Sequence, residues 1–487
     1  MVVTDPLQNW YAQLSPRKAA LFVGVMIGLV GGLVGLLTTV AGPVIAFGAV
    51  FGLLAGLCIL TSVQAALYGV IFVMILLPFG TLPVRIGFTP TFMDAALGAF
   101  LLVYGMQWMQ GRRQAMQLTP VHSLIALYIM WLLLTFALGL RHAMPTSHIL
   151  RQFAETLLSI SMTFILVDLL REPLLLRRLV LVVMIAIGLQ AAGALVLYVL
   201  PDATAENLLV RLARIGYPNG GVIRYIESNP DLAERAIGTW VDPNAFGGVL
   251  AVAAAMFAPQ VFARKPVLRY RWLTFGVLGV VTLALILTFS RASALAFAAG
   301  IGLIAIARYR RYIPLLLFGA LLLFLLPQTQ QYIERFAQGF AGQDLATQMR
   351  IGEYTDALRL INRYPIFGVG FTGTPENDIY ANVASLYLIM ANQIGLAGVA
   401  LFLTTMGAVF MYGVATYRRA RANPDLEAIH LGYHAALLTA LVNGAADLYF
   451  FRIDFQASIA LFWLTTALAL ASSRLAQLTV DKSLQLR

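Results

Sequence analysis

The 487-residue chain has few charged residues, one cysteine and five histidines. Charged residues make up 11% of the chain, whereas a soluble domain carries roughly 25%, so a soluble globular protein is excluded. The single cysteine, Cys58, cannot form an internal disulfide. The histidines show no metal-ligand spacing, and the polar connections contain no P-loop or GxSxG sequence. Nothing in the sequence therefore indicates a metal, a nucleotide cofactor or a serine hydrolase.

Apolar residues make up 60% of the chain and form many runs of the roughly 20 residues that cross a bilayer. Because backbone polar groups must be satisfied within lipid, and alternating β-barrel segments are absent, the runs are predicted to be helices. We predict an all-α integral membrane protein, a polytopic bundle of about 14 (12–14) transmembrane helices with a large extracytoplasmic helical loop. The predicted spans are 19–41, 44–62, 65–83, 94–110, 121–140, 151–170, 179–200, 244–263, 272–290, 292–307, 313–327, 385–416, 429–449 and 455–474.

Clusters of basic residues fall on every second connection between these spans, as at Arg17-Lys18, Arg112-Arg113 and Arg308-Arg310-Arg311. Cytoplasmic connections of membrane proteins collect Lys and Arg, so these connections and both termini are predicted to be cytoplasmic. The net charge of +11 then reflects membrane orientation, and no nucleic acid partner is predicted. The N-terminus lacks a cleavable signal-peptide pattern and reads as a cytoplasmic lead into the first span.

This topology divides the chain into five parts. Residues 1–200 form an N-terminal transmembrane bundle, 201–243 an extracytoplasmic segment, and 244–327 further transmembrane helices. Residues 328–383 form a large extracytoplasmic loop over the outer mouth of the bundle, and 384–487 the last transmembrane helices and a cytoplasmic tail. Within the large loop, 344–363 has apolar residues at helical spacing and predicts an amphipathic helix that ends before Tyr364-Pro365.

Arginines mark the predicted outer face. Arg291 joins two apolar runs with almost no loop between them, so it lies at the membrane boundary, where a charge is costly. It could contact an anion or extend to the interface. Arg235 precedes Asp242-Pro243-Asn244, which reads as a turn and a helix start. Arg350 has Glu353 and Asp356 on the same predicted helix, so a solvated ion pair is the alternative to a site.

Two intramembrane acids and a glycine-rich sequence are further candidates for function. Glu155 and Asp447 are acids within apolar runs, and each could serve a polar site or a structural hydrogen bond. Gly368-Val369-Gly370-Phe371-Thr372-Gly373 matches GxGxxG formally. A dinucleotide site requires a preceding strand and a βαβ unit, which are not predicted here, so this interpretation is rejected.

Four sequence elements follow one another within residues 230–475, on a polytopic chain with a large outer loop before the last spans. In this order they resemble the O-antigen ligase and O-antigen polymerase superfamily of bacterial membrane proteins. The elements are Arg235…Gly238…Pro243-Asn244; Ser290-Arg291-Ala292-Ser293; Arg350 followed by Asn362-Arg363-Tyr364-Pro365-Ile366-Phe367-Gly368-Val369-Gly370; and Tyr387-Leu388 followed by Asn392-Gln393-Ile394-Gly395-Leu396-Ala397-Gly398.

The resemblance implies a glycosyltransferase of cell-envelope polysaccharide biosynthesis, with lipopolysaccharide as one such product, in the bacterial inner membrane. The donor would be a glycan on undecaprenyl diphosphate, the acceptor a lipid or a glycan, and no metal or other cofactor would be needed. Carried to this chain, the diphosphate-binding role falls on Arg235, Arg291, Arg350 and Arg363. Catalytic roles fall on Arg291, Arg350 and Glu353.

One position departs from the family pattern. Ligases of the family commonly carry His-Asn before the Tyr-Leu element, and the corresponding residues here are Ala384 and Ser385. Glu353, Asp378 and His142 are possible replacements for the missing base. Ligase and polymerase therefore both stay open. A polytopic lipid or oligosaccharide transporter or flippase is the alternative class, although no internal repeat is apparent, and a non-catalytic scaffold is the third.

Overall fold

The computed structural model describes residues 62–85, 87–111, 115–314, 345–373 and 383–485, with a few isolated positions elsewhere. The chain divides into two compact units, Met1–Ala66 and Leu67–Arg487. The predicted spans 19–41 and 44–62, and most of 313–327, lie outside the described residues, although the isolated positions described within 24–56 are helical.

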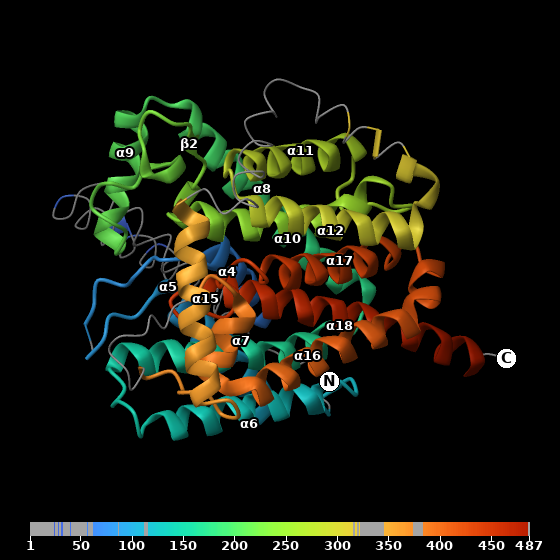
Figure 1. The fold of residues 1–487 in the computed structure, drawn as a ribbon. Coiled ribbons are helices and arrows are strands. Elements are labelled where there is room, and N and C mark those ends of the chain that lie inside the picture. The colour runs from blue at the N-terminus through green and yellow to red at the C-terminus, as the bar shows by residue number, and fades with distance from the viewer. Residues whose placement is uncertain are drawn as a thin grey trace. The chain divides into compact units, whose positions relative to one another are not determined.

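The described part of Leu67–Arg487 is almost entirely helical (Figure 1), which confirms a helical membrane fold. Eight of its helices are long and apolar enough to cross a membrane, and the predicted number of about 14 spans is not confirmed. The eight are α5 Phe92–Met109, α6 His122–Gly139, α7 Ser147–Leu169, α8 Pro173–Val199, α10 Pro243–Val261, α12 Arg291–Arg308, α16 Leu386–Ala422 and, within α18 Gln456–Gln485, the stretch Gln456–Leu478. Shorter helices include α4 Val63–Leu76, α11 Arg271–Leu287 and α17 Glu427–Asn443.

Several of these helices begin at side chains that satisfy the free amides of a first turn. Thr91 and Asp94 form a capping box at the start of α5. Asp242 accepts hydrogen bonds from two amides of α10, whose first residue is Pro243, and Ser290 accepts one from the amide of Ser293 in α12. These caps fix where the helices begin, and hence which polar residues stand at their ends.

The predicted extracytoplasmic segment after α8 folds into short elements. They are α9 Asp202–Val210, η1 Arg211–Ile215, β1 Arg224–Tyr225, η2 Ile226–Ser228, β2 Glu234–Arg235 and η3 Gly238–Trp240. The strands pair antiparallel, and this is the one sheet among the described residues. The fully buried Trp240 donates its indole N–H to the carbonyl of Ile75 at 3.1 Å, which fastens the segment to the end of α4.

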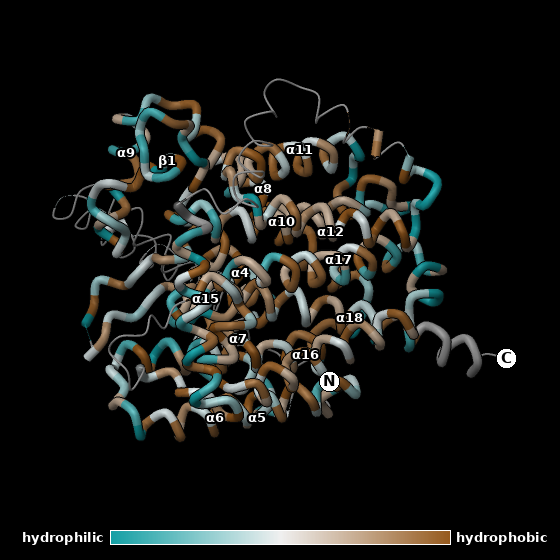
Figure 2. Tube along the Cα trace, viewed as in Figure 1, coloured by the Kyte–Doolittle hydropathy of each residue, from teal (hydrophilic) through white to brown (hydrophobic). Residues whose placement is uncertain are grey.

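Helices α10, α12 and α17 pack on one another in the core. α10 is buried along nearly its whole length, and most of its buried residues are small or aromatic. A Cβ at Gly300 of α12 would overlap the Thr439 hydroxyl of α17, so the two helices approach as closely as glycine permits. Figure 2 shows apolar residues along the middle of these helices and hydrophilic ones toward their ends.

These three helices connect two polar clusters. Pro243, Arg291 and Asn443 stand at one end, which we call the Asp447 end, while Val261, Arg308 and Glu427 stand at the other, the Glu427 end. At 1.5 Å per residue the ends are about 25 Å apart, close to the roughly 30 Å of a bilayer's hydrocarbon core.

Basic residues of several connections form ion pairs at the Glu427 end. Arg264 and Arg308 pair with Glu427, and Arg177 and Lys265 pair with Asp425. The membrane side that this end faces stays a prediction from the basic residues.

The amphipathic helix predicted at 344–363 is present as α15 Leu345–Arg363, and the connection after α12 includes the short turn η4 Arg310–Tyr312. In Figure 1, α15 runs across the direction of its neighbouring helices, at the same end as α9 and β2. Ala357 and Leu360 are buried, whereas Met349 and Leu358 are exposed. α15 packs against α16, and its Glu353 and Tyr354 hydrogen-bond to the backbone of Ala384, just before that helix begins.

The break in α16 explains the glycines of the third and fourth sequence elements. Gly395 has φ 72° and ψ 171°, and a Cβ there would overlap the carbonyl of Ile366. The carbonyls freed by the break accept hydrogen bonds from outside the helix, which satisfies backbone buried in the bundle. The bonds are Val369 N to Asn392 O at 2.8 Å, Gly370 N to Gln393 O at 2.9 Å and Trp131 Nε1 to Ile394 O at 3.0 Å. The GxG sequence thus donates hydrogen bonds to carbonyls at the break in α16. This structural role agrees with the rejection of a dinucleotide site.

Candidate functional site

Arg235 ties the segment 201–243 to the start of α10 and to the end of α11. Its Nε donates to the carbonyl of Thr288 at 2.7 Å, and a terminal nitrogen donates to Asn244 Oδ1 at 2.6 Å. The amide of Ala236 donates to Leu287 O at 2.8 Å, which adds a second link to the end of α11. The half-buried guanidinium is therefore fixed where α10 begins and α11 ends.

The turn from α11 to α12 is tight, as predicted from the near absence of a loop at Arg291. Phe289 has a positive φ of 52°, and Arg291 is the first residue of α12, with a half-buried side chain. The hydroxyls of Ser290 and Ser293 lie 2.9 Å apart. Asn443 Nδ2 donates to Ser293 Oγ at 3.2 Å, so this turn is joined to the end of α17.

A buried carboxyl, Asp447, lies next to this turn, in the loop that follows α17. Asn443 Nδ2 stands 3.4 Å from Asp447 Oδ2, and a terminal nitrogen of Arg350 on α15 stands 3.7 Å from Oδ1. The side chain of Asp447 is 3% exposed and that of Arg350 is 31% exposed. Arg350 therefore reaches from the rim of the bundle toward a buried acid.

The charges around Asp447 compete. The pKa of this carboxyl is raised to about 7. Burial is the main cause, Arg350 and Arg235 act to lower the pKa, and the nearby Asp242 acts to raise it. A carboxyl with a pKa near neutrality can take up a proton and release it again, which suits a general base.

Glu353 and Tyr354 hold the backbone at the position where the family pattern has histidine. Glu353 Oε2 accepts from the amide of Ala384 at 3.0 Å, and the hydroxyl of Tyr354 donates to the carbonyl of Ala384 at 3.2 Å. Glu353 is half-buried and one turn from Arg350 on α15. Its carboxylate thus contacts the backbone just before the start of α16.

The remaining predicted residues are not brought into this cluster. Arg363 is exposed at the far end of α15, about 20 Å along the helix axis from Arg350 at 1.5 Å per residue. His142 packs edge-on against the ring of Tyr364, beside Arg363 in the chain. Asp378 lies outside the described residues.

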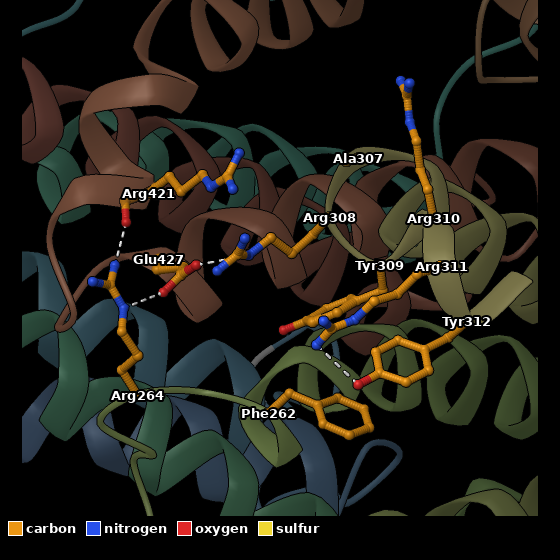
Figure 3. Close-up of a pocket in the computed structure, with 10 residues that line it drawn as sticks. All are labelled: Phe262, Arg264, Ala307, Arg308, Tyr309, Arg310, Arg311, Tyr312, Arg421 and Glu427. Carbon is orange, nitrogen blue, oxygen red and sulfur yellow. Dashed lines mark hydrogen bonds and ion pairs between the residues drawn. The ribbon is translucent and has the colours of Figure 1, made fainter.

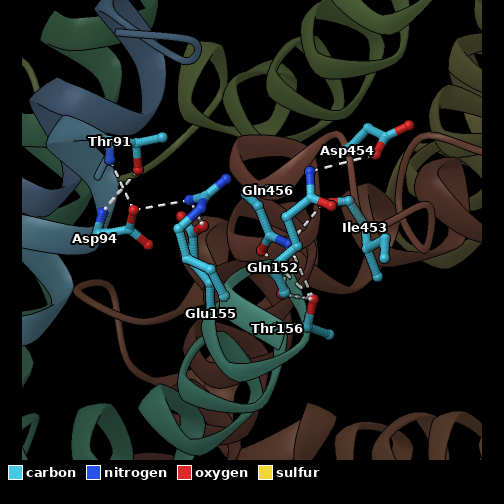
Figure 4. A network of polar contacts seen from close by, with 9 residues as sticks. Thr91, Asp94, Gln152, Glu155, Thr156, Ile453, Asp454 and Gln456 are labelled. Atoms are coloured by element: carbon cyan, nitrogen blue, oxygen red, sulfur yellow. Dashed lines mark hydrogen bonds and ion pairs between the residues drawn. The ribbon is translucent and has the colours of Figure 1, made fainter. Parts of the chain in front are cut away.

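A second polar network lies at the N-termini of α5, α7 and α18 (Figure 4). Arg151 pairs with Asp94 at 2.7 Å and with Glu155 at 3.0 Å. Gln456 Nε2 donates to the carbonyl of Gln152 at 2.7 Å, and Gln152 Nε2 donates to Asp454 at 3.3 Å. These contacts join three helix starts, which favours the structural interpretation of Glu155 over the functional one.

The structure brings Arg235, Arg350 and the Arg291 turn together at the Asp447 end, through Asp447, Asn443 and Ser293. The sequence alone identifies Asp447 only as an acid in an apolar run, and it gives no reason to choose Asn443. The contact between Asn443 and Ser293 could not be predicted from local sequence, because the two residues are 150 positions apart in the chain. Among the described residues, no group of three or more His, Cys, Asp and Glu side chains could hold a metal ion.

The O-antigen ligase family matches residues 276–403. The matched stretch includes the Arg291 turn, α15 and the broken start of α16, which are three of the four elements that carried the resemblance. The O-antigen ligase/polymerase resemblance is thereby confirmed, and it indicates glycan processing of the cell envelope with lipid-linked substrates. With the candidate spans, it also indicates a bacterial inner-membrane protein. A search among curated proteins finds no significant match to this chain.

Proposed function

We propose that this protein is a membrane glycosyltransferase that moves a glycan from undecaprenyl diphosphate to a lipid or glycan acceptor on the outer face of the inner membrane. The observation that carries the proposal is the meeting of Arg235, Arg350 and the Arg291 turn around the buried Asp447. This cluster lies at the Asp447 end, opposite the Glu427 end where several basic connections gather. The positive-inside rule therefore supports an extracytoplasmic site.

The reaction exchanges one carbon–oxygen bond for another. An acceptor hydroxyl attacks the anomeric carbon of the donor, the bond from that carbon to the diphosphate oxygen breaks, and undecaprenyl diphosphate leaves with the bonding electron pair. Negative charge therefore grows on the leaving oxygen. Guanidinium groups of Arg235, Arg291 and Arg350 stabilise it, since arginine forks match phosphate oxygens and act most strongly where water is partly excluded. This arrangement supplies positive charge without a metal ion.

The proton of the acceptor hydroxyl also needs a recipient. We assign this role to Asp447, whose pKa of about 7 leaves a sizeable fraction ionised at neutral pH. Ala384 has no side chain that could act as a base, and the carboxylate of Glu353 already accepts a hydrogen bond from the amide of Ala384. Arg350 lies between solvent and Asp447, so one guanidinium can approach both the leaving group and the base.

A transfer assay with the purified protein in lipid vesicles tests this proposal. The donor is a short oligosaccharide on undecaprenyl diphosphate, the acceptors are a lipid core and a second donor molecule, and products are separated by mass. Transfer to the lipid core indicates a ligase, and growth of the glycan indicates a polymerase. Transfer should persist with excess EDTA.

The matched variants are Arg350→Gln and Arg211→Gln. Arg211 is an exposed arginine of the same predicted outer side and does not belong to the cluster. Arg350→Gln should lower transfer by about 10²–10³-fold, and Arg211→Gln should leave it unchanged. Movement of the intact donor across the vesicle membrane without any glycosidic product would support the transporter class instead.

A further inference from the structure

A pocket of about 750 Å³ opens at the Glu427 end, between the ends of α10, α12 and α16 and the start of α17 (Figure 3). Arg291 and Pro243, at the opposite ends of α12 and α10, lie about 25 Å away at 1.5 Å per residue. The glycan transfer proposed above therefore gives this pocket no role. Its charged lining residues are Arg264, Arg308, Arg310, Arg311, Arg421 and Glu427.

The pocket carries a large excess of positive charge. Its lining includes five arginines and one glutamate, which leaves a formal charge of four positive. Arg264 and Arg308 point toward Glu427 (Figure 3), at 2.8 and 2.9 Å from its carboxylate oxygens. Within the described part of the chain, Arg311 and Arg421 form no ion pair. Orientation in a membrane needs only that basic residues stand on one side, whereas here several of them line one pocket.

Aromatic rings line the same pocket. The guanidinium of Arg311 lies 4.8 Å from the ring centre of Tyr312 and also donates to its hydroxyl at 3.0 Å. Phe262 packs at 5.3 Å from Tyr309 and 6.4 Å from Tyr312, and its side chain is 59% exposed. Tyrosine and arginine together are typical of the headgroup level of a bilayer, where a ring contacts apolar atoms and its polar end contacts phosphate or water.

An apolar groove of about 150 Å³ adjoins the charged pocket and shares Ala307 with it. The groove runs along α12, α16 and α17, and its lining includes Leu303, Phe410, Val414, Tyr417 and Leu431. The hydroxyl of Tyr417 donates to Ala307 O at 3.1 Å and fixes the wall between the two hollows. Buried Ile304, Leu431 and Ala435 form the apolar floor behind it.

We propose that the pocket and groove together bind one anionic glycerophospholipid of the leaflet at the Glu427 end. Arg311 and Arg421 contact the headgroup phosphate, Arg264 and Arg308 contribute positive charge from positions fixed by Glu427, and one acyl chain lies along the groove beside Leu303 and Val414. Basic pockets between membrane helices bind anionic headgroups because phosphate meets several cations, while the chain stays in an apolar environment. A soluble phosphate compound would leave the adjoining groove empty.

The full-length protein in detergent micelles allows a direct test by native mass spectrometry. The probes are phosphatidylglycerol, phosphatidylcholine of the same chain length, and glycerol 3-phosphate. Phosphatidylglycerol should remain bound at concentrations about tenfold below those needed for phosphatidylcholine, and glycerol 3-phosphate should not bind at those concentrations. Equal binding of the two lipids would overturn the anionic assignment, and binding of glycerol 3-phosphate as tightly as the lipid would show a soluble-phosphate site.

Two variants separate the headgroup from the chain. Arg311→Gln with Arg421→Gln should weaken phosphatidylglycerol binding by about tenfold or more, whereas Arg178→Gln, at an exposed arginine of the same end outside the pocket, should leave it unchanged. Leu303→Trp should weaken lipid binding by filling the groove. Unaltered binding in the double arginine variant, or an equal loss in Arg178→Gln, would remove the pocket as the site.

Discussion

α12 begins at Arg291 and ends at Arg308, and the surroundings of these two arginines differ. Arg308 lies among four other arginines, with a single carboxylate, Glu427, between two of them. Arg291 lies in a turn that connects through Ser293 and Asn443 to the buried acid Asp447, which Arg350 approaches from a different helix. Excess positive charge suits attraction of an anionic surface, whereas separate arginines around a titratable buried acid suit chemistry.

The two acids of these ends offer the largest expected contrast. Asp447→Asn should lower the rate of transfer by about 10²–10⁴-fold, because it removes the group that takes the acceptor proton while keeping the size of the side chain. Asp425→Asn, which removes the partner of Arg177 and Lys265 at the other end, should leave the rate unchanged. Single-turnover rates in vesicles measure both, and full activity of Asp447→Asn would exclude Asp447 as the base.

The arginines give the next contrast. Arg291→Gln should lower transfer by about 10²–10³-fold, since it removes one donor to the leaving diphosphate. Arg178→Gln, at the start of α8, loses the same charge at the opposite end and should keep full activity. Expression and thermal unfolding of each variant serve as the folding control, and an equal effect of the two changes would argue against a specific site.

A third comparison concerns the two parts of α16. Gly395→Ala should lower the unfolding temperature, because its φ and ψ are essentially confined to glycine, at a cost of roughly 1–3 kcal/mol, and because the added Cβ would overlap Ile366. Gly407→Ala lies on the uninterrupted part of the same helix with open space around it, so it should be neutral or slightly stabilising. Thermal unfolding in one detergent measures both. Equal stability of the two variants would mean that the break is not required.

The smallest expected effect is a shift in pH dependence. Transfer should rise with pH through about 7, because Asp447 accepts a proton only when ionised. Asp242 raises the pKa of Asp447, so Asp242→Asn should move the midpoint to lower pH. Asparagine also caps helices well, so α10 should keep its start. An unshifted midpoint would separate Asp242 from Asp447, and a rate that falls with rising pH would contradict the role of a base.

Much of the fold could be predicted from the sequence. The predicted spans 94–110, 121–140 and 244–263 differ from α5, α6 and α10 by only a few residues at each end. This agreement arises because a span of about 20 apolar residues is a local property. α4 and α11 are also at their predicted places but are shorter than a full span.

The candidate site was predicted less completely. Arg235, Arg291 and Arg350 could be chosen because a charge near lipid is costly and therefore conspicuous. A helix over 344–363 already implies that Arg363 lies far along its axis from Arg350. Which end of this helix lies at the cluster could not be predicted, since it depends on how α15 crosses the bundle. The engagement of Glu353 with the Ala384 amide likewise depends on α15 meeting the start of α16.

The sequence alone determined that this protein is a helical membrane protein resembling O-antigen ligases and polymerases, because hydrophobic length and short motifs are carried by neighbouring residues. Only the tertiary structure decided that Asp447 stands among the arginines and that the other end holds a charged pocket beside an apolar groove. Both depend on contacts between helices far apart in the chain. Such contacts are set by side-chain packing between helices rather than by the sequence of any one of them.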